Sequence, residues 1–136
     1  MANAAVNQQA ALDKYEAGDL EGAIRDFTEI IRENPNNATA LYNRGAILAE
    51  ADHHQAAAAD FDAAIALLPE NADLYHAAAL SKRKLGDTRG AFDAANKAVE
   101  LLPHDPDNYL LRANCRVDLS DREGALDDYS EAIRIF

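Results

Sequence analysis

The sequence has few of the residues that β-strands favour. Val, Ile and Thr together supply only 13 of the 136 residues, whereas Ala alone supplies 30 and Leu 15. β-Branched side chains pack well on a pleated sheet, while Ala and Leu are among the best helix formers. The composition therefore excludes an all-β protein and favours an all-α one.

Basic residues are also scarce. The 13 Lys and Arg residues are outnumbered by 24 Asp and Glu residues, which gives a net charge of −11. Proteins that bind nucleic acid or an anionic membrane surface need a net basic face, because the phosphates they contact are negative. We therefore expect neither nucleic acid nor a membrane surface as a partner.

Long apolar runs and a secretion signal are absent as well. No run approaches the roughly 20 apolar residues that cross a bilayer. The first six residues have neither the basic start nor the apolar stretch of a signal peptide. The single cysteine, Cys115, cannot form an internal disulfide. We expect a soluble, cytoplasmic protein with no membrane insertion.

What the sequence does contain is a 34-residue period. Pro35, Pro69 and Pro103 recur at this spacing, each after an apolar stretch. Four further columns keep the same spacing, and their members are Ala11, Gly45, Ala79 and Ala113; Ala23, Ala57, Ala91 and Ala125; Phe27, Phe61, Ala95 and Tyr129; and Ile31, Ile65, Val99 and Ile133. Such a period indicates a repeat architecture in which stacked neighbours bury each other's apolar faces.

Within each period the local signals predict two helices. Gly86 can end a helix in the left-handed conformation and Asp87 can cap the next one, and Gly18 with Asp19 repeats this pattern. The small residues of the columns predict a close approach of the two helices in a hairpin. The expected helices span 4–16, 21–33, 38–50, 55–67, 72–84, 89–101, 106–118 and 122–135.

This helix–turn–helix unit, with Gly or Ala in the first helix, Ala and Phe or Tyr in the second and Pro at the end, resembles the tetratricopeptide repeat. The resemblance implies an all-α, right-handed α-solenoid of four repeats, namely 4–37, 38–71, 72–105 and 106–136, in one domain over 1–136. It also implies a scaffold that binds a protein or peptide partner, because such repeats seldom catalyse reactions.

In tetratricopeptide arrays the first helices of successive repeats line a concave groove. One stripe of each first helix is expected to face it, and the candidate groove residues are Gln8, Leu12 and Tyr15; Tyr42 and Asn43; His76, Leu80 and Arg83; and Leu110, Asn114 and Val117. A competing interpretation is that Leu12, Leu80 and Leu110 only pack between neighbouring first helices. Co-chaperones of the family grip a carboxylate in this groove. Here only Asn43 fits that pattern, and Asp73 would repel a carboxylate, so we do not expect this activity.

The last predicted helix has an apolar face with no following repeat in this sequence. Its residues are Leu126, Tyr129, Ile133 and Phe136. Exposed apolar patches indicate an interaction surface. The protein is therefore expected either to be a fragment or accessory domain of a larger protein, or to form a homo-oligomer through this face. In the second case it is a structural assembly unit and the groove is idle.

The sequence lacks enzyme signatures. It contains no Gly-rich phosphate loop, no His-Glu-x-x-His and no Gly-x-Ser-x-Gly. Cys115 lies within a predicted helix among apolar neighbours, which indicates a buried structural thiol. Adjacent His53 and His54 diverge by about 100° on a helix and suit a shared metal badly. We expect no catalysis, no cofactor and no metal.

Overall fold

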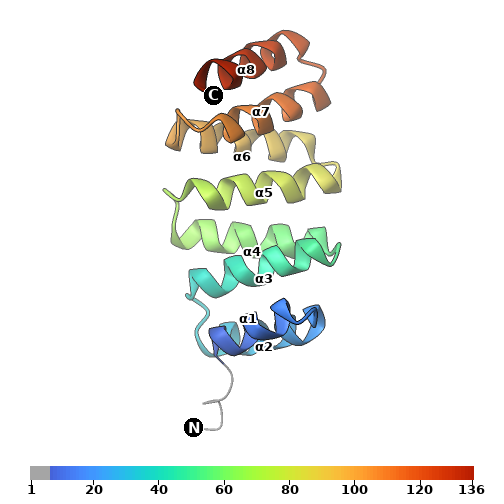
Figure 1. The fold of residues 1–136 in the computed structure, drawn as a ribbon, viewed down its shortest axis with the longest axis vertical. Helices are drawn as coiled ribbons and strands as arrows, with labels where there is room; N and C mark the ends of the chain where they lie inside the picture. Colours follow the sequence, from blue (N-terminus) through green and yellow to red (C-terminus); the bar gives the residue numbers. More distant parts are fainter. Residues whose placement is uncertain (1–6) are drawn as a thin grey trace. The chain divides into compact units, whose positions relative to one another are not determined.

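The computed structural model describes residues 7–136, and every regular element within them is an α-helix (Figure 1). The helices are α1 (Gln8–Glu16), α2 (Leu20–Glu33), α3 (Ala38–Glu50), α4 (His54–Leu67), α5 (Ala72–Leu85), α6 (Thr88–Leu101), α7 (Pro106–Asp118) and α8 (Arg122–Ile135). The prediction of an all-α chain with four helical hairpins is confirmed. From α2 to α8 the predicted bounds agree to within one residue at each end.

The first helix begins later than predicted. We expected it to span 4–16, but it begins at Gln8, because Asn7 is extended and its side chain accepts a hydrogen bond from the backbone N–H of Ala10. This bond satisfies one of the donors that a helix start leaves open, so Asn7 fixes the boundary. Residues 4–6 of the predicted range lie outside the described residues.

Each hairpin turns on one residue with a positive φ. Gly18 and Gly86 have φ values of 90° and 82°, and Asp52 and Ser120 have values of 67° and 65°. Glycine adopts this left-handed conformation freely, whereas a residue with a side chain loses about 1–2 kcal/mol there. The second and fourth hairpins, which lack the glycine, therefore contain a strained turn residue.

Side-chain caps begin almost every described helix. Asp19, Asp87 and Asp121 accept from the backbone N–H three residues later and start the second helices of three hairpins. Asn37, Asn71 and Asp105 start the first helices. His53 precedes α4 without a side-chain cap. The capping pattern read from the sequence is therefore present, and α4 has the weakest start.

The chain divides into two compact units, Met1–Pro69 and Glu70–Phe136. In the first unit α2 packs against α1 and α3, and α3 packs against α4 (Figure 1). Its core contains Ala11, Ala23, Phe27, Ala40 and Ile47, with Phe27 fully buried. The core is thus built by residues of the predicted columns together with their neighbours.

The crossing of α3 and α4 is close at Gly45. A methyl group at Gly45 would lie 2.8 Å from Cε1 of Phe61, whose side chain is only 3% exposed. Real Cβ atoms do not approach neighbours so closely, so the alanine found at this position in the other three hairpins does not fit beside Phe61 without movement. The small residue at this position of the column Ala11, Gly45, Ala79 and Ala113 therefore lets α3 and α4 approach closely.

In the second unit α6 packs against α5 and α7, and α7 packs against α8 (Figure 1). Ala95, which replaces the aromatic residue of its column, is fully buried. Phe92 lies one helical turn earlier, with the guanidinium groups of Arg89 and Arg116 5.6 Å and 5.5 Å from its ring centroid. The aromatic ring of α6 is therefore that of Phe92, three residues before the column position that Ala95 occupies. None of the helices in the described chain has the length and hydropathy to cross a membrane.

Candidate functional site

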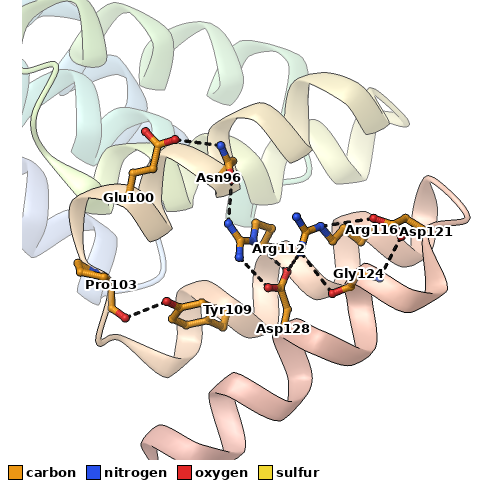
Figure 2. Close-up of polar contacts among 9 residues, drawn as sticks. All are labelled: Asn96, Glu100, Pro103, Tyr109, Arg112, Arg116, Asp121, Gly124 and Asp128. Atoms are coloured by element: carbon orange, nitrogen blue, oxygen red, sulfur yellow. Dashed lines mark hydrogen bonds and ion pairs between the residues drawn. The ribbon is translucent and has the colours of Figure 1, made fainter.

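In the second unit, the partly buried side chain of Arg112 holds α7 in place. Nε and Nη2 of Arg112 donate to the two carboxylate oxygens of Asp128 on α8, at 2.9 Å and 2.7 Å, and Nη1 donates to Oδ1 of Asn96 on α6 at 2.8 Å (Figure 2). These hydrogen bonds to Asp128 are the main reason that the pKa of Arg112 is raised. One side chain therefore ties three helices together.

Asp128 receives a second arginine. Nη1 of Arg116 donates to Oδ2 of Asp128 at 2.9 Å and to the carbonyl oxygen of Gly124 at 3.3 Å (Figure 2). Asp128 is only 3% exposed, so the two guanidinium groups, rather than water, provide the hydrogen bonds to its carboxylate. The α7–α8 hairpin is thus organised around one buried carboxylate.

The first unit contains the same arrangement at the equivalent positions, two repeats earlier in the sequence. Arg44 on α3 donates through Nε and Nη2 to both oxygens of Asp60 on α4, each at 2.7 Å, and through Nη1 to Oγ1 of Thr28 on α2 at 3.2 Å. The pKa of Arg44 is raised chiefly by its hydrogen bond to Asp60. Sequence analysis missed these residues. The recurrence of both Arg and Asp at a spacing of two repeats was the available signal.

Polar side chains also bridge first helices in the first unit. The hydroxyl of Tyr15 on α1 donates to Oε2 of Glu50 on α3 at 2.6 Å, and this hydrogen bond is the largest cause of the raised pKa of Tyr15. Asn43 Nδ2 donates to Gln8 Oε1 at 3.4 Å. Tyr15, Gln8 and Asn43 were candidate groove residues, whereas Glu50 was not predicted.

The second unit contains corresponding bridges. Arg83 on α5 pairs with Asp118 on α7, at 2.7 Å from Nε and 3.3 Å from Nη2. Nδ1 of His76 lies 2.8 Å from Oδ1 of Asn108. Because the amide nitrogen of Asn108 donates to the carbonyl of Ala98, the Asn108 oxygen accepts, and His76 carries a proton on Nδ1. Asp118 and Asn108 were not among the predicted site residues.

The apolar groove candidates differ in how much they are covered. Tyr42, Leu80 and Val117 are 37%, 46% and 50% exposed. Leu12 and Leu110 are half-buried, and Leu12 packs against the core of the first unit. The packing interpretation therefore describes Leu12, while Leu80 leaves nearly half of its surface free.

The predicted face of the last helix is only partly open. Leu126, Ile133 and Phe136 are 64%, 72% and 82% exposed. Tyr129 is half-buried, and its hydroxyl donates to Oδ1 of Asn114 on α7 at 2.5 Å. Tyr129 and Asn114 therefore contact each other within the α7–α8 hairpin.

Comparison with known proteins agrees with this architecture. The family model described as Tetratricopeptide repeat matches residues 9–72. Residues 9–72 therefore match tetratricopeptide repeats, and the helical hairpins of the described chain continue the same fold beyond them. A search of curated proteins finds no match.

Solved structures of MamA share the tetratricopeptide repeat fold. A crystal structure of MamA is 22% identical with a TM-score of 0.89, over 92% of this chain and 73% of that one. MamA from Desulfovibrio magneticus RS-1 is 22% identical with a TM-score of 0.88, over 94% and 72%. Tetratricopeptide repeat proteins are generally non-catalytic scaffolds for protein interaction, and the fold supports that role here.

Proposed function

We propose that the protein is a non-catalytic, cytoplasmic interaction module that binds a peptide or a partner helix on the first-helix face of each unit, formed by α1 and α3 in the first unit and by α5 and α7 in the second. The observation that carries this proposal is the coexistence of exposed apolar side chains and polar bridges on these helices. Tyr42, Leu80 and Val117 are exposed, while the bridges fix the helices that carry them. A face fixed before binding loses less entropy when a partner docks.

The two classes of groove residue have different roles in this proposal. Tyr42, Leu80 and Leu110 supply apolar contact area, with Leu12 and Tyr15 at its edge. The polar groups of Asn43, His76, Arg83 and Asn114 already have partners within their units. They orient a partner through their remaining donors and acceptors, and they also support the face itself.

Affinity capture with matched variants tests the proposal. Tyr42→Ala and Leu80→Ala are expected to keep the helical circular dichroism spectrum and to lose most of the proteins that the wild type captures from a cell extract. Leu102→Ala is the control, because Leu102 is 43% exposed but follows α6, outside the first helices. Equal capture by the wild type and by both groove variants would show that the first-helix face is not the binding surface.

A second candidate function is self-association through α8. The residue that corresponds to Ile133 on α6 is Val99, one repeat earlier, and it is only 6% exposed in a unit where α7 packs against α6. Ile133 is 72% exposed. The exposed face of α8 is thus of the kind that a further helix covers, and a second copy could supply that cover.

Sedimentation separates this candidate from the first. If the α8 face mediates self-association, the wild type is expected to sediment as a dimer or larger species and Ile133→Lys as a monomer. Ile133 is a better probe than Tyr129, because removing the Tyr129 hydroxyl also breaks its bond to Asn114. A wild type that stays monomeric at high concentration excludes self-association.

A further inference from the structure

The first helices of the first unit leave their acidic groups uncompensated. Asp13 and Glu16 on α1 and Glu50 on α3 are exposed, and none of the three has an ion pair among the described residues. Glu50 accepts the Tyr15 hydroxyl, which is a neutral donor and leaves the carboxylate charge in place. The exposed surface of α1 and α3 therefore carries three negative charges, and Tyr42, which is 37% exposed, lies on α3 as well.

The cations of the same two helices point elsewhere. Lys14 on α1 pairs with Asp26 on α2 at 2.9 Å, and Arg44 on α3 pairs with Asp60 on α4. Both pairs join a first helix to a second helix of its own hairpin. The positive charges of α1 and α3 are thus held on the side where the hairpins pack, and they do not neutralise Glu16 or Glu50.

The second unit shows what compensation at this position looks like. The residues two repeats after Tyr15 and Glu50 are Arg83 and Asp118, and they form a bidentate ion pair. The same bridge between first helices is therefore neutral overall in the second unit and negative in the first. The difference lies in one residue, Tyr15 or Arg83, and it changes the charge of the face without removing the bridge.

We infer that the face formed by α1 and α3 binds a basic segment of a partner protein, with Lys or Arg side chains beside Glu16 and Glu50 and apolar side chains over Leu12 and Tyr42. The inference rests on the proposed groove function and names the partner class for its first half. Opposite charges attract at such a rim, and an aromatic face adds affinity for a cation. Attraction between opposite charges mainly raises the rate at which the partner associates and selects basic partners over acidic ones.

Net charge argues against a second copy of this chain as the occupant. The sequence 1–69 contains four Lys and Arg (14, 25, 32 and 44) and eleven Asp and Glu, so it carries −7 of the total −11. The rest of the sequence carries the other −4. Two copies therefore repel each other, whereas a cationic partner is attracted over distances of about 10 Å.

The test uses the full chain and two synthetic helical peptides of equal length. They share Leu and Ala positions and differ only in carrying Lys or Glu on the polar face. Fluorescence anisotropy is expected to show tighter binding of the Lys peptide, and added salt is expected to weaken it. Glu50→Gln and Glu16→Gln should each weaken it about threefold, the usual range for one exposed ion pair. Gln at position 50 can still accept the Tyr15 hydroxyl.

Two further variants sharpen the test. Tyr15→Arg places a guanidinium where Arg83 stands in the second unit, and it should bring the two peptides to within about twofold of each other. Asp127→Asn removes an exposed charge from α8 and should change nothing.

The outcomes separate this inference from the groove function. If the Lys peptide binds no better than the Glu peptide, or if the Gln variants bind like the wild type, the basic partner is excluded. If Tyr42→Ala still weakens partner capture in that case, the proposed groove function remains supported. If Tyr42→Ala has no effect on capture either, the groove function and the basic partner are both excluded. If Glu50→Gln instead changes the sedimentation of the chain alone, a second copy occupies the face and the inference is overturned.

Discussion

Removing the carboxylate of Asp128 should destabilise the second unit strongly. Asp128 is 3% exposed and accepts two hydrogen bonds from Arg112 and one from Arg116. In Asp128→Ala both arginines would remain partly buried, with side-chain exposures of 16% and 22%. Arg112 would lose its carboxylate partner, and Arg116 would keep only Asp121, at 3.6 Å. The variant therefore loses a charge network and leaves two like charges close together.

The magnitude follows from this burial. Removing one partner of a buried ion pair costs about 3–5 kcal/mol, because the other charge stays desolvated. Arg112 and Arg116 retain some contact with water, so we expect the lower end, about 3 kcal/mol. Asp60→Ala in the first unit should cost less, about 2 kcal/mol, because Asp60 compensates only Arg44, whose side chain is 21% exposed.

Urea denaturation followed by circular dichroism measures this cost. Asp127→Ala is the matched control, since its side chain is exposed on the same helix and should change the free energy of unfolding by less than about 0.5 kcal/mol. Replacing the pair together, with Arg112→Met and Asp128→Leu, should recover part of the loss. A loss below about 1 kcal/mol for Asp128→Ala would refute the reasoning, since it would mean that water reaches both guanidinium groups.

Three further changes test packing, turn geometry and burial. Gly45→Ala should lower the free energy of unfolding by about 1 kcal/mol, because overpacking against Phe61 outweighs the helix propensity of Ala, and it should become stabilising in a Phe61→Ala background. Ser120→Gly should raise that free energy by about 0.5–1 kcal/mol in the same urea assay by removing strain at positive φ. Burial raises the pKa of Cys115 from 9.0 to about 11. Its native thiolate fraction near about pH 8 should therefore be about 100-fold lower than in the unfolded chain, with matching slow labelling by a thiol reagent. Because only the unfolded thiol ionises readily, stability should fall as the pH rises from 9.0 to about 11.

Much of the fold was predictable because backbone-level signals repeat in the sequence. Pro35, Pro69 and Pro103 stop the second helices, and Gly18 and Gly86 mark turns, since these residue types restrict or free the backbone wherever they occur. The error at the first helix came from the 34-residue period, which places the start of that helix at residue 4. The capping side chain of Asn7 instead sets its start at Gln8.

The polar bridges were not predictable in the same way. Tyr15 and Glu50 lie 35 residues apart, and Arg112 and Asp128 lie 16 apart. Which side chains meet at such separations depends on how neighbouring helices are rotated against each other, and the apolar columns fix that rotation only roughly. The groove candidates were therefore chosen by face, and their partners on the adjacent first helix were left out.

The charged residues of the two units fall into two groups, one kept in both units and one that differs between them. Arg44 with Asp60 and Arg112 with Asp128 keep the same geometry two repeats apart, as an architectural bond must if both units are to pack alike. The net charge of the first-helix bridge differs between the units, because the acidic acceptor is kept in Glu50 and Asp118 while the donor is the neutral Tyr15 in one and the cationic Arg83 in the other. The stability of the unit requires only the hydrogen bond between the first helices. The net charge of that bridge can therefore differ between the units and determine which partner binds. Substitutions at Asp128 should therefore lower the free energy of unfolding with little effect on the surface that binds a partner. Substitutions at Glu50 should weaken partner binding with little effect on the free energy of unfolding.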